Sequence, residues 1–462
     1  MTARYKKKSA VDSLISFKNS EGLLSKGTLL NIHNDMVVFE VYNPYSIVQT
    51  SEVLSEFTVK KSKALVYQGK AVVVHLVNTG LMLIVSAKLE EEWLGQLEHL
   101  DLVSGDIAQF LEAWETHHEL LPNFRLVVEE MRSFLFEFNR WLSVSKLSGA
   151  AQSNTESLEQ MTQMIWPTWL ALMQRFEQEA AHIPDDLASI HRTFVQHNLH
   201  PLLLPAPFVH RTHTKPLGYA GDYEMINMIL RNTFEGETDY AKVVHKLNLL
   251  PPTPLSVRHR NDIMLGYVLQ GAQQAVQRQQ PFKVLSIACG PAVEIQRFIR
   301  QHAALMPPVP ITIELLDFSQ HTLDETQKKI SALLAQTKAS HIQVHYICES
   351  VHTLLKKPQQ IEQRLNQYDL VYSGGLFDYL SNQVCTRLLK LFYKWLKPGG
   401  KAFTTNMYSE YSGNFMMAYI LEWFLIYRTE ADMLAWVTNL GCQRVFADET
   451  GINLFLEIEK PV

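Results

Sequence analysis

The sequence predicts a three-part protein whose C-terminal part is an α/β domain built on a doubly wound, mainly parallel sheet. Apolar strands alternate with amphipathic helices after about residue 256. Before them, apolar residues recur at helical spacing, and the first 92 residues hold short β-rich runs between turn residues. A chain of 462 residues also exceeds what one core usually serves.

Residues 1–92 predict a small β-barrel. Runs rich in apolar and β-branched residues alternate with turn residues, as expected for closed sheets of this size. The dipeptide Gln68-Gly69 is expected to form one of the turns. The expected strands cover residues 28–32, 36–42, 56–59, 64–67, 71–77 and 81–86.

Residues 93–255 predict a helical connector. Phe124, Leu135 and Trp141 belong to a stripe of apolar residues at three- and four-residue spacings, and the pattern recurs at 158–176. Such stripes usually form a core, so we expect a helical bundle between the barrel and the C-terminal domain. The same bundle could carry a homodimer interface.

Residues 256–462 are expected to form the α/β domain and to hold its ligand site. An apolar strand runs into a turn of small residues and then into an amphipathic helix. Small residues in such a turn let backbone N–H groups approach a ligand closely. The turn consists of Ala288, Cys289 and Gly290.

A carboxylate follows the next apolar run, because residues 311–316 lead directly into Asp317 and Phe318. A carboxylate at the C-terminal end of a strand can accept both hydroxyls of a ribose. The preceding turn lacks the full G-x-G-x-x-G set of glycines, and no G-x-x-x-x-G-K-[ST] motif occurs. These features predict a site for a nucleoside without phosphates.

Two later segments continue the pattern. Residues 368–373 form another apolar run that opens into a glycine pair, and residues 396–401 end a helix before a strand at 402–405. This order of segments resembles the class I S-adenosylmethionine-dependent methyltransferases. The resemblance implies a seven-stranded, Rossmann-like domain with helices on both faces and S-adenosyl-L-methionine as the cofactor.

The resemblance also implies where the cofactor lies. Its methionine part would contact the turn at Gly290, its ribose Asp317, and its adenine Glu349, which follows a strand at 343–347. The reacting methyl group would face the segment that begins at Ser373. The expected cofactor-binding residues are Ala288, Cys289, Gly290, Asp317, Phe318, Glu349, Ser350, Ser373 and Gly374.

A polar, glycine-containing segment at 211–225 precedes this domain. Two glycines bracket Tyr219 and Ala220, which indicates a shaped loop, and Asp222 is placed to cap the following helix. The segment resembles one in a bacterial family of 3-hydroxypalmitate methyl ester synthases, which make a fatty-acid methyl ester used as a quorum-sensing signal. The resemblance rests on Lys215, Pro216, Gly218, Tyr219, Ala220, Gly221, Asp222 and Tyr223, and further on residues 200–204, Arg258, Arg260, 289–291 and 373–379.

Methyl transfer from a sulfonium to an oxygen is an in-line displacement, so the protein must hold the oxygen about 3 Å from the methyl carbon and exclude water. A carboxylate acceptor is already anionic and needs only a positioning cation or hydroxyl, for which the candidates are Arg258, Lys215, Tyr219 and Tyr379. An alcohol or amine would need a base, for which the candidates are Asp378, Asp222 and His259. The expected catalytic residues are Tyr219, Asp222, Arg258, Asp378 and Tyr379.

Residues 408–428 are rich in methionine and aromatic residues. In this fold such an insertion often covers the acceptor, and its composition suits a flexible apolar ligand such as an acyl chain. The alternative is ordinary packing against the helical bundle.

Composition excludes some partners and favours a cytoplasmic protein. A net charge of −5 gives no general attraction to nucleic acid or anionic membranes, and no apolar stretch is long enough to span a bilayer. The four cysteines are too widely spaced for a metal knuckle or a redox pair. Two H-x-x-H pairs, at 197–200 and 210–213, lack nearby cysteines, and we expect no bound metal.

Residues 26–40 resemble the core of a PilZ domain, many of whose members bind cyclic di-GMP. Here Arg4 is followed by Lys8, and Asn31 by His33 and Met36 in place of the serine and glycine of the binding members. We therefore expect the barrel not to bind the nucleotide. Two other functions stay open: a methyltransferase acting on another small metabolite or a protein side chain, and a cyclic di-GMP sensor with an inert methyltransferase fold.

Overall fold

The structure is a computed structural model. It describes residues 13–33, 35–41, 48–61, 64–78, 83–91, 120–147, 154–184, 187–302, 307–356, 362–411 and 413–462. Contacts divide the chain into two compact units. The first comprises Met1–Glu119 with Leu217–Tyr219, and the second comprises Leu120–Pro216 with Ala220–Val462.

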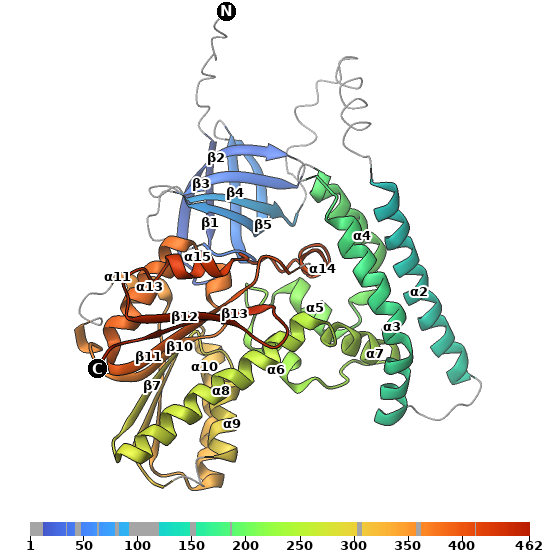
Figure 1. The fold of residues 1–462 in the computed structure, drawn as a ribbon. Coiled ribbons are helices and arrows are strands. Elements are labelled where there is room, and N and C mark those ends of the chain that lie inside the picture. The colour runs from blue at the N-terminus through green and yellow to red at the C-terminus, as the bar shows by residue number, and fades with distance from the viewer. Residues whose placement is uncertain are drawn as a thin grey trace, which may run out of the picture. The chain divides into compact units, whose positions relative to one another are not determined.

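The first unit contains a closed, six-stranded antiparallel barrel, as the sequence predicts (Figure 1). Its strands are β1 Ser13–Lys18, β2 Leu24–His33, β3 Met36–Val41, β4 Val53–Lys61, β5 Ala64–Asn78 and β6 Leu83–Leu89, in the order β1-β2-β3-β6-β5-β4. Alternate residues of each strand face the interior, where the rings of Phe17, Phe39 and Phe57 pack against one another.

The predicted turn at Gln68-Gly69 is wrong, because β5 continues through it. Gly69 pairs with Phe57 next to a shift in register in β4, where Glu56 adopts a left-handed φ of +47°. A bulge absorbs an extra residue without ending the strand, and a strand glycine often marks such a position. The sequence also did not predict β1. Arg4, Lys8 and the expected strand ends at 42 and 81–82 lie outside the described residues.

The second unit begins with the predicted helices. Phe124 and Leu135 of α2 and Phe176 of α3 are fully buried between the helices, whereas Trp141 is 56 % exposed, contrary to the prediction. At this turn of α2 it is Leu142 that faces the core. Trp141, one residue earlier, lies about 100° away around the helix and therefore faces outward. The helices of this region are α2 Pro122–Leu147, α3 Thr155–Ala180, α4 Ala188–Leu203, α5 Pro207–Thr214, α6 Tyr223–Arg231, α7 Asp239–Leu249 and α8 Pro252–Arg278.

A seven-stranded sheet follows in the order β12-β13-β11-β10-β7-β8-β9, which confirms the predicted Rossmann-like fold class. Its strands are β7 Phe282–Ile287, β8 Ile311–Asp317, β9 Ile342–Cys348, β10 Tyr368–Ser373, β11 Leu396–Met407, β12 Cys442–Ala447 and β13 Asn453–Glu459. β13 runs antiparallel to both of its neighbours, β11 and β12, and the other neighbouring strands of the described sheet run parallel.

Helices cover both faces of this sheet, as predicted (Figure 1). One face packs against α8, α9 Val293–Gln301 and α10 Gln320–Thr337. The other packs against α11 Val351–Lys356, α13 Asn382–Trp395 and α15 Glu430–Ala435. The remaining elements are the 3-10 turn η3 Phe377–Tyr379 and the short helix α14 Asn414–Tyr419.

The strand order determines where a ligand can bind. β7 lies between β8 and β10. After β7 the chain adds strands β8 and β9 on one side of it, and from β10 on it adds strands on the other side, so the strand order reverses between β7 and β10. In open α/β sheets, ligands bind in the crevice outside the carboxyl ends of the strands at this reversal of order. A ligand site is therefore expected at the carboxyl ends of β7, β8 and β10.

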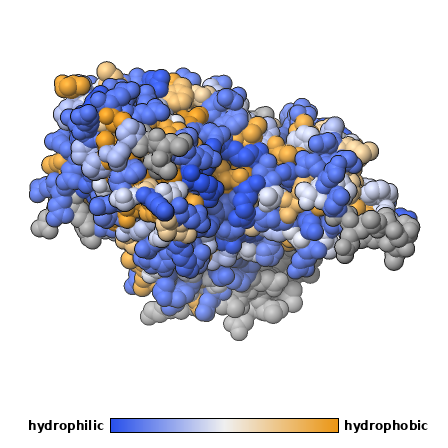
Figure 2. Space-filling view, turned by 90° about the horizontal axis from the view of Figure 1, so that it is seen from below, coloured by the Kyte–Doolittle hydropathy of each residue, from blue (hydrophilic) through white to orange (hydrophobic). Residues whose placement is uncertain are grey.

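The predicted division at residues 92, 255 and 462 stays a prediction. The boundary at 255 falls inside α8, and the helical region shares one compact unit with the sheet. No described helix is long and apolar enough to cross a membrane. On the face shown in Figure 2, hydrophobic residues are scattered over a largely hydrophilic surface.

Two glycines of α8 should respond in opposite directions to substitution by alanine. A Cβ at Gly271 would lie 2.5 Å from the Phe282 ring, whereas a Cβ at Gly266 would meet no atom within 4 Å. We expect Gly266→Ala to raise the free energy of unfolding by about 0.5–1 kcal/mol, because alanine favours a helix. We expect Gly271→Ala to lower it by about 1–3 kcal/mol through overpacking. Urea unfolding measures both, and equal effects would contradict the close contact of α8 with β7.

Candidate functional site

β7 ends in a tightly wound turn. Ala288, Gly290 and Ala292 have left-handed φ angles of +51°, +52° and +45°. Alanine rarely adopts this conformation, and residues held in it gather at ligand sites. A Cβ at Gly290 would meet no atom within 4 Å, so the space outside the turn is open. Cys289 lies between Ala288 and Gly290, and burial raises the pKa of its thiol well above the usual value. The thiol is therefore a poor nucleophile.

The Asp317 side chain holds this turn against the end of β8 through a hydrogen bond. One carboxylate oxygen accepts a hydrogen bond from the Gly290 N–H at 3.0 Å, and the other accepts one from the Ser319 N–H at 3.0 Å. Burial raises the pKa of Asp317, while these N–H groups lower it. Each carboxylate oxygen keeps a second lone pair. Asp317 can therefore accept hydrogen bonds from a ligand while it holds the turn.

The end of β9 lies beside Asp317. The Glu349 N–H donates to the Asp317 carbonyl at 3.1 Å, and the Glu349 carboxylate lies 3.9 Å from the Arg364 guanidinium. Ser350 caps α11, because its hydroxyl accepts from the Thr353 N–H at 3.2 Å. Phe318, half-buried, follows Asp317. The predicted cofactor residues thus lie on adjacent strand ends.

The end of β10 contains two glycines against α8. A Cβ at Gly374 would lie 2.5 Å from the Met264 sulfur, and one at Gly375 would lie 3.0 Å from both terminal nitrogens of Arg260. Gly375 has a φ of +89°, and its N–H donates to the Thr405 hydroxyl at 3.1 Å. Gly374 therefore makes room for Met264, and Gly375 makes room for the Arg260 guanidinium at the edge of the sheet.

Arg260 is not among the site residues expected from the sequence, although it lies beside Gly375. Its side chain is 7 % exposed, yet among the described residues no carboxylate oxygen lies within 4.0 Å of it and no hydrogen bond reaches it. Burial lowers the pKa of its guanidinium, and the charge of Asp378 opposes that effect. A buried cation without a partner is unfavourable unless an anion joins it. The missed signal is the helical stripe of α8, where Arg260 takes a place among buried residues such as Val257 and Met264.

Arg258, which was expected in the site, contacts the ends of two helices. Its guanidinium donates to the carbonyl of Ile229 at 3.3 Å and to that of Leu249 at 3.1 Å, at the ends of α6 and α7. Cations commonly bind these orphan carbonyls at helix C-termini. Two positions in a helix separate Arg258 and Arg260 by about 200°, so they point in different directions.

Asp378 and Tyr379 lie just beyond the glycines. The Asp378 carboxylate accepts from the Met407 N–H at 2.7 Å, and burial raises its pKa, while Arg260 lowers it. The Tyr379 hydroxyl accepts from the Trp423 indole at 2.8 Å, and burial raises the pKa of this hydroxyl. Both residues therefore stand at the same edge as Arg260.

The Arg428 side chain holds this loop in place. Its guanidinium, 2 % exposed, donates to the carbonyls of Phe377 and Leu380 and to the side chains of Asn382 and Asn406. Every face of this cation is occupied, unlike that of Arg260. Arg428 is thus a structural arginine that fixes the position of Asp378 and Tyr379.

Asp222 is the predicted helix cap. Its carboxylate accepts from the Glu224 and Met225 N–H groups and from the Arg211 guanidinium, at 2.8–3.0 Å. These four contacts leave it little capacity to act as a base. Tyr219 belongs to the other compact unit, and the structure does not place it relative to these strand ends.

Lys215, a candidate for holding the acceptor, is paired instead. Its ammonium lies 3.8 Å from the Glu422 carboxylate, with both side chains buried. Glu422 also accepts from the Gln196 amide at 2.9 Å. The pair therefore ties the insertion at 408–428 to the helical region.

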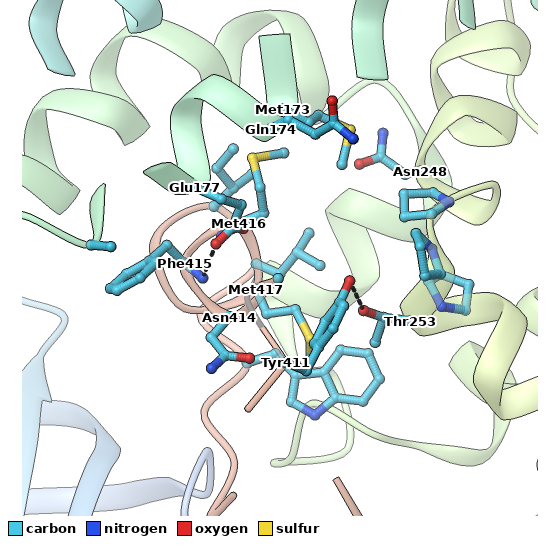
Figure 3. Close-up of a pocket in the computed structure, with 18 of the residues that line it drawn as sticks. Met173, Gln174, Glu177, Asn248, Thr253, Tyr411, Asn414, Phe415, Met416 and Met417 are labelled. Atoms are coloured by element: carbon cyan, nitrogen blue, oxygen red, sulfur yellow. Dashed lines mark hydrogen bonds between the residues drawn. The ribbon is translucent and has the colours of Figure 1, made fainter. Parts of the chain in front are cut away.

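The insertion also lines a large pocket of about 920 Å³ (Figure 3). We call it the methionine pocket, after Met173, Met416 and Met417. Figure 3 shows Met173 and Gln174 on one side, with Tyr411 and Thr253 opposite. Its other described lining residues are Leu170, Glu177, Gln178, Ala181, His182, Phe208, Asn248, Pro251, Pro252, Pro254, Ser409, Glu410, Gly413, Asn414, Phe415, Ile420, Leu421 and Trp423. Met416, Met417 and Trp423 also belong to the core of the helical region, as expected for ordinary packing. That the insertion covers an acceptor stays a prediction.

Glu177 is one of two acidic residues that line this pocket, the other being Glu410. The Glu177 carboxylate accepts from the Phe415 and Met416 N–H groups at 3.0 and 2.7 Å, at the start of α14. Burial raises its pKa to about 7. Among the residues that the structure describes, no group of three or more His, Cys, Asp or Glu side chains could hold a metal ion.

Neither a protein-family model nor a curated protein matches the chain. Solved structures similar to it include a possible exported protein from Bordetella parapertussis, with 17 % identity over 55 % of this chain and 86 % of that one and a TM-score of 0.40. Another is magnesium protoporphyrin IX methyltransferase from Synechocystis PCC 6803, with 11 % identity over 51 % of this chain and 93 % of that one and a TM-score of 0.34. A third is DszA carbon methyltransferase, with 11 % identity over 77 % of this chain and 92 % of that one and a TM-score of 0.38. TM-scores below 0.5 do not establish a shared fold, so the fold class is assigned from the strand order of the sheet.

The two buried arginines should respond differently to substitution by methionine. We expect Arg260→Met to keep or raise the free energy of unfolding, by up to about 1–3 kcal/mol, because it removes a buried charge that has no partner. We expect Arg428→Met to lower it by about 3 kcal/mol or more, because it leaves several carbonyl groups unpaired. Urea unfolding followed by tryptophan fluorescence compares them. A large loss of stability in Arg260→Met would show that nearby acids already balance this charge.

Glu177 should make stability depend on pH. Between about pH 4.5 and 7 the folded state keeps a proton that the unfolded state has lost, so stability falls as pH rises through this window and levels off above it. Relative to Glu177→Gln, the wild type should lose at most about 3 kcal/mol. Urea unfolding at several pH values gives the difference, with Glu156→Gln at the exposed start of α3 as control. Parallel pH profiles for wild type and Glu177→Gln would contradict the raised pKa.

Proposed function

We propose that this protein is an S-adenosylmethionine-dependent methyltransferase. The observation that carries the proposal is the open, left-handed turn at Gly290, fastened by the buried Asp317 carboxylate at the switch point of the sheet. Backbone N–H groups and one carboxylate suit an uncharged ribose better than a diphosphate. The sequence resemblance supports the same cofactor.

The residues at the strand ends would hold the cofactor in three places. The turn at Ala288–Gly290 would contact its methionine part, Asp317 would accept from the ribose hydroxyls, and Glu349 would lie near the adenine. When bound, the cofactor supplies a methyl group on a positively charged sulfur. Asp378, at the end of β10, would offer a negative charge to that sulfonium region.

For the acceptor we propose a carboxylate, carried by a 3-hydroxy fatty acid or a similar apolar acid. Arg260 supports this choice, because it offers a buried cation with free donors beside Gly375. It takes over the positioning role that the sequence assigned to Arg258. Tyr379 is the nearby hydroxyl that could orient the same group, whereas Asp222 and Arg258 would support the site from outside.

The reaction would need no general base. A carboxylate oxygen would attack the methyl carbon, a C–O bond would form as the C–S bond breaks, and the products would be a methyl ester and neutral S-adenosylhomocysteine. Arg260 and Tyr379 would hold the attacking oxygen in line, and the apolar surroundings would exclude water. The protein would contribute orientation and charge balance.

Two alternatives follow from particular residues. Arg260 could hold the carboxylate of the cofactor itself, and Asp378 could then serve as base for an alcohol or amine on a small metabolite or protein side chain. A cyclic di-GMP sensor is the other alternative; Arg4 and Lys8 lie outside the described residues. A cytoplasmic location and a homodimer through α2, where Leu126 and Trp141 are exposed, also remain proposals.

Calorimetry with S-adenosylmethionine tests the cofactor. We expect Asp317→Ala to weaken binding about tenfold to a hundredfold, because a hydrogen bond to a charged group contributes about 1.5–3 kcal/mol. Asp324→Ala, at an exposed position of α10, should bind like wild type. Equal affinity of both variants would refute the ribose assignment.

Labelled methyl transfer to a panel of carboxylic acids, alcohols and amines tests the acceptor. If Arg260 holds the acceptor, Arg260→Met should raise KM for acids and leave cofactor affinity unchanged. Loss of cofactor affinity in Arg260→Met would instead assign Arg260 to the cofactor.

A further inference from the structure

We propose that the methionine pocket binds the hydrocarbon chain of the acceptor, with the carboxylate of that molecule directed out of the pocket toward Arg260. The proposal rests on the proposed function for the reaction, but the binding of the chain stands on the pocket alone. Helix α3 and the 408–423 segment, which line the pocket, would then bind the chain of the acceptor, whereas the residues at the strand ends would bind the cofactor.

The size and lining of the pocket fit such a chain. A volume of about 920 Å³ is near the upper end of small-molecule sites, which are about 300–1,000 Å³. Methionine is flexible and polarizable, so Met173, Met416 and Met417 can adapt to a chain with many conformers. Aromatic rings such as that of Tyr411 complete the wall.

Charge determines which end enters. Among the described residues that line the pocket there is no lysine or arginine, whereas Glu177 and Glu410 are acidic. A carboxylate inside the pocket would lie near Glu177 without a compensating cation, which is unfavourable. Arg260, buried and without a partner, provides the cation outside the pocket. The apolar end therefore goes in and the carboxylate stays out.

The pocket and the edge of the sheet share a boundary. Trp423 lines the pocket, and its indole N–H donates to the hydroxyl of Tyr379 at 2.8 Å. Tyr379 directly follows Asp378, whose charge acts on Arg260. This hydrogen bond thus connects the wall of the pocket to the segment that lies beside Arg260.

Helix α3 offers matched variants. Met173 and Gln174 line the pocket, whereas Met164 of the same helix is 82 % exposed. Met173→Trp should fill part of the pocket, and Met164→Trp adds the same side chain to solvent. Gln174→Trp, at an exposed position of the pocket rim, is a second filling variant that leaves the core intact should Met173→Trp fail to fold.

The experiment measures binding and turnover for octanoate, laurate and palmitate. Calorimetry without cofactor should show affinity rising about fourfold for each methylene, the equivalent of about 0.8 kcal/mol per buried CH₂. Met173→Trp should lose at least tenfold in affinity for palmitate and little for octanoate, and Met164→Trp should match wild type. The KM values for methyl transfer should follow the same order.

Two outcomes separate this proposal from the proposed function. Methyl transfer to acids with no dependence on chain length, or with the same dependence in both filling variants and wild type, would overturn the pocket assignment while the function stands. Binding that follows chain length and is lost in Met173→Trp, without methyl transfer to any acid, would support the pocket and refute the function.

Discussion

The hydrogen bond from the Gly290 N–H to the Asp317 carboxylate is the interaction on which the candidate site depends. It joins the ends of β7 and β8 at the point where the order of the sheet reverses. The left-handed residues of the turn need such an anchor, because alanine does not hold this conformation by itself. With the turn fixed, its open side faces the crevice where doubly wound sheets bind ligands.

Two buried arginines differ in how their charge is satisfied. Arg428 donates to carbonyl and amide oxygens around the loop that carries Asp378 and so stabilises the fold. Arg260 lies beside Gly375 and lacks a partner among the described residues, so the burial of its charge is unfavourable by itself. Sites that bind charged ligands often retain this kind of local instability.

The 408–428 segment links the helical region to the sheet. Lys215 pairs with Glu422, Glu177 accepts from the start of α14, and Trp423 reaches Tyr379. These contacts place the walls of the methionine pocket next to the end of β10. The same residues therefore pack a core and shape a cavity, which is why composition alone could not choose between the two interpretations.

The sequence by itself determined the five parallel strands β7 to β11 of the Rossmann-like sheet, most of the stripes of α2 and α3, the cap at Asp222 and the pairing of a small-residue turn with Asp317. These follow from local rules of periodicity, turn chemistry and strand order. Only the tertiary structure decided that β5 continues through Gly69, that Trp141 is exposed and that Arg260, rather than Arg258, lies beside Gly375. Those outcomes depend on a bulge in β4, on which neighbour of a helical turn faces inward and on space beside Gly375. Each is set by contacts between segments far apart in the chain, which no local pattern records.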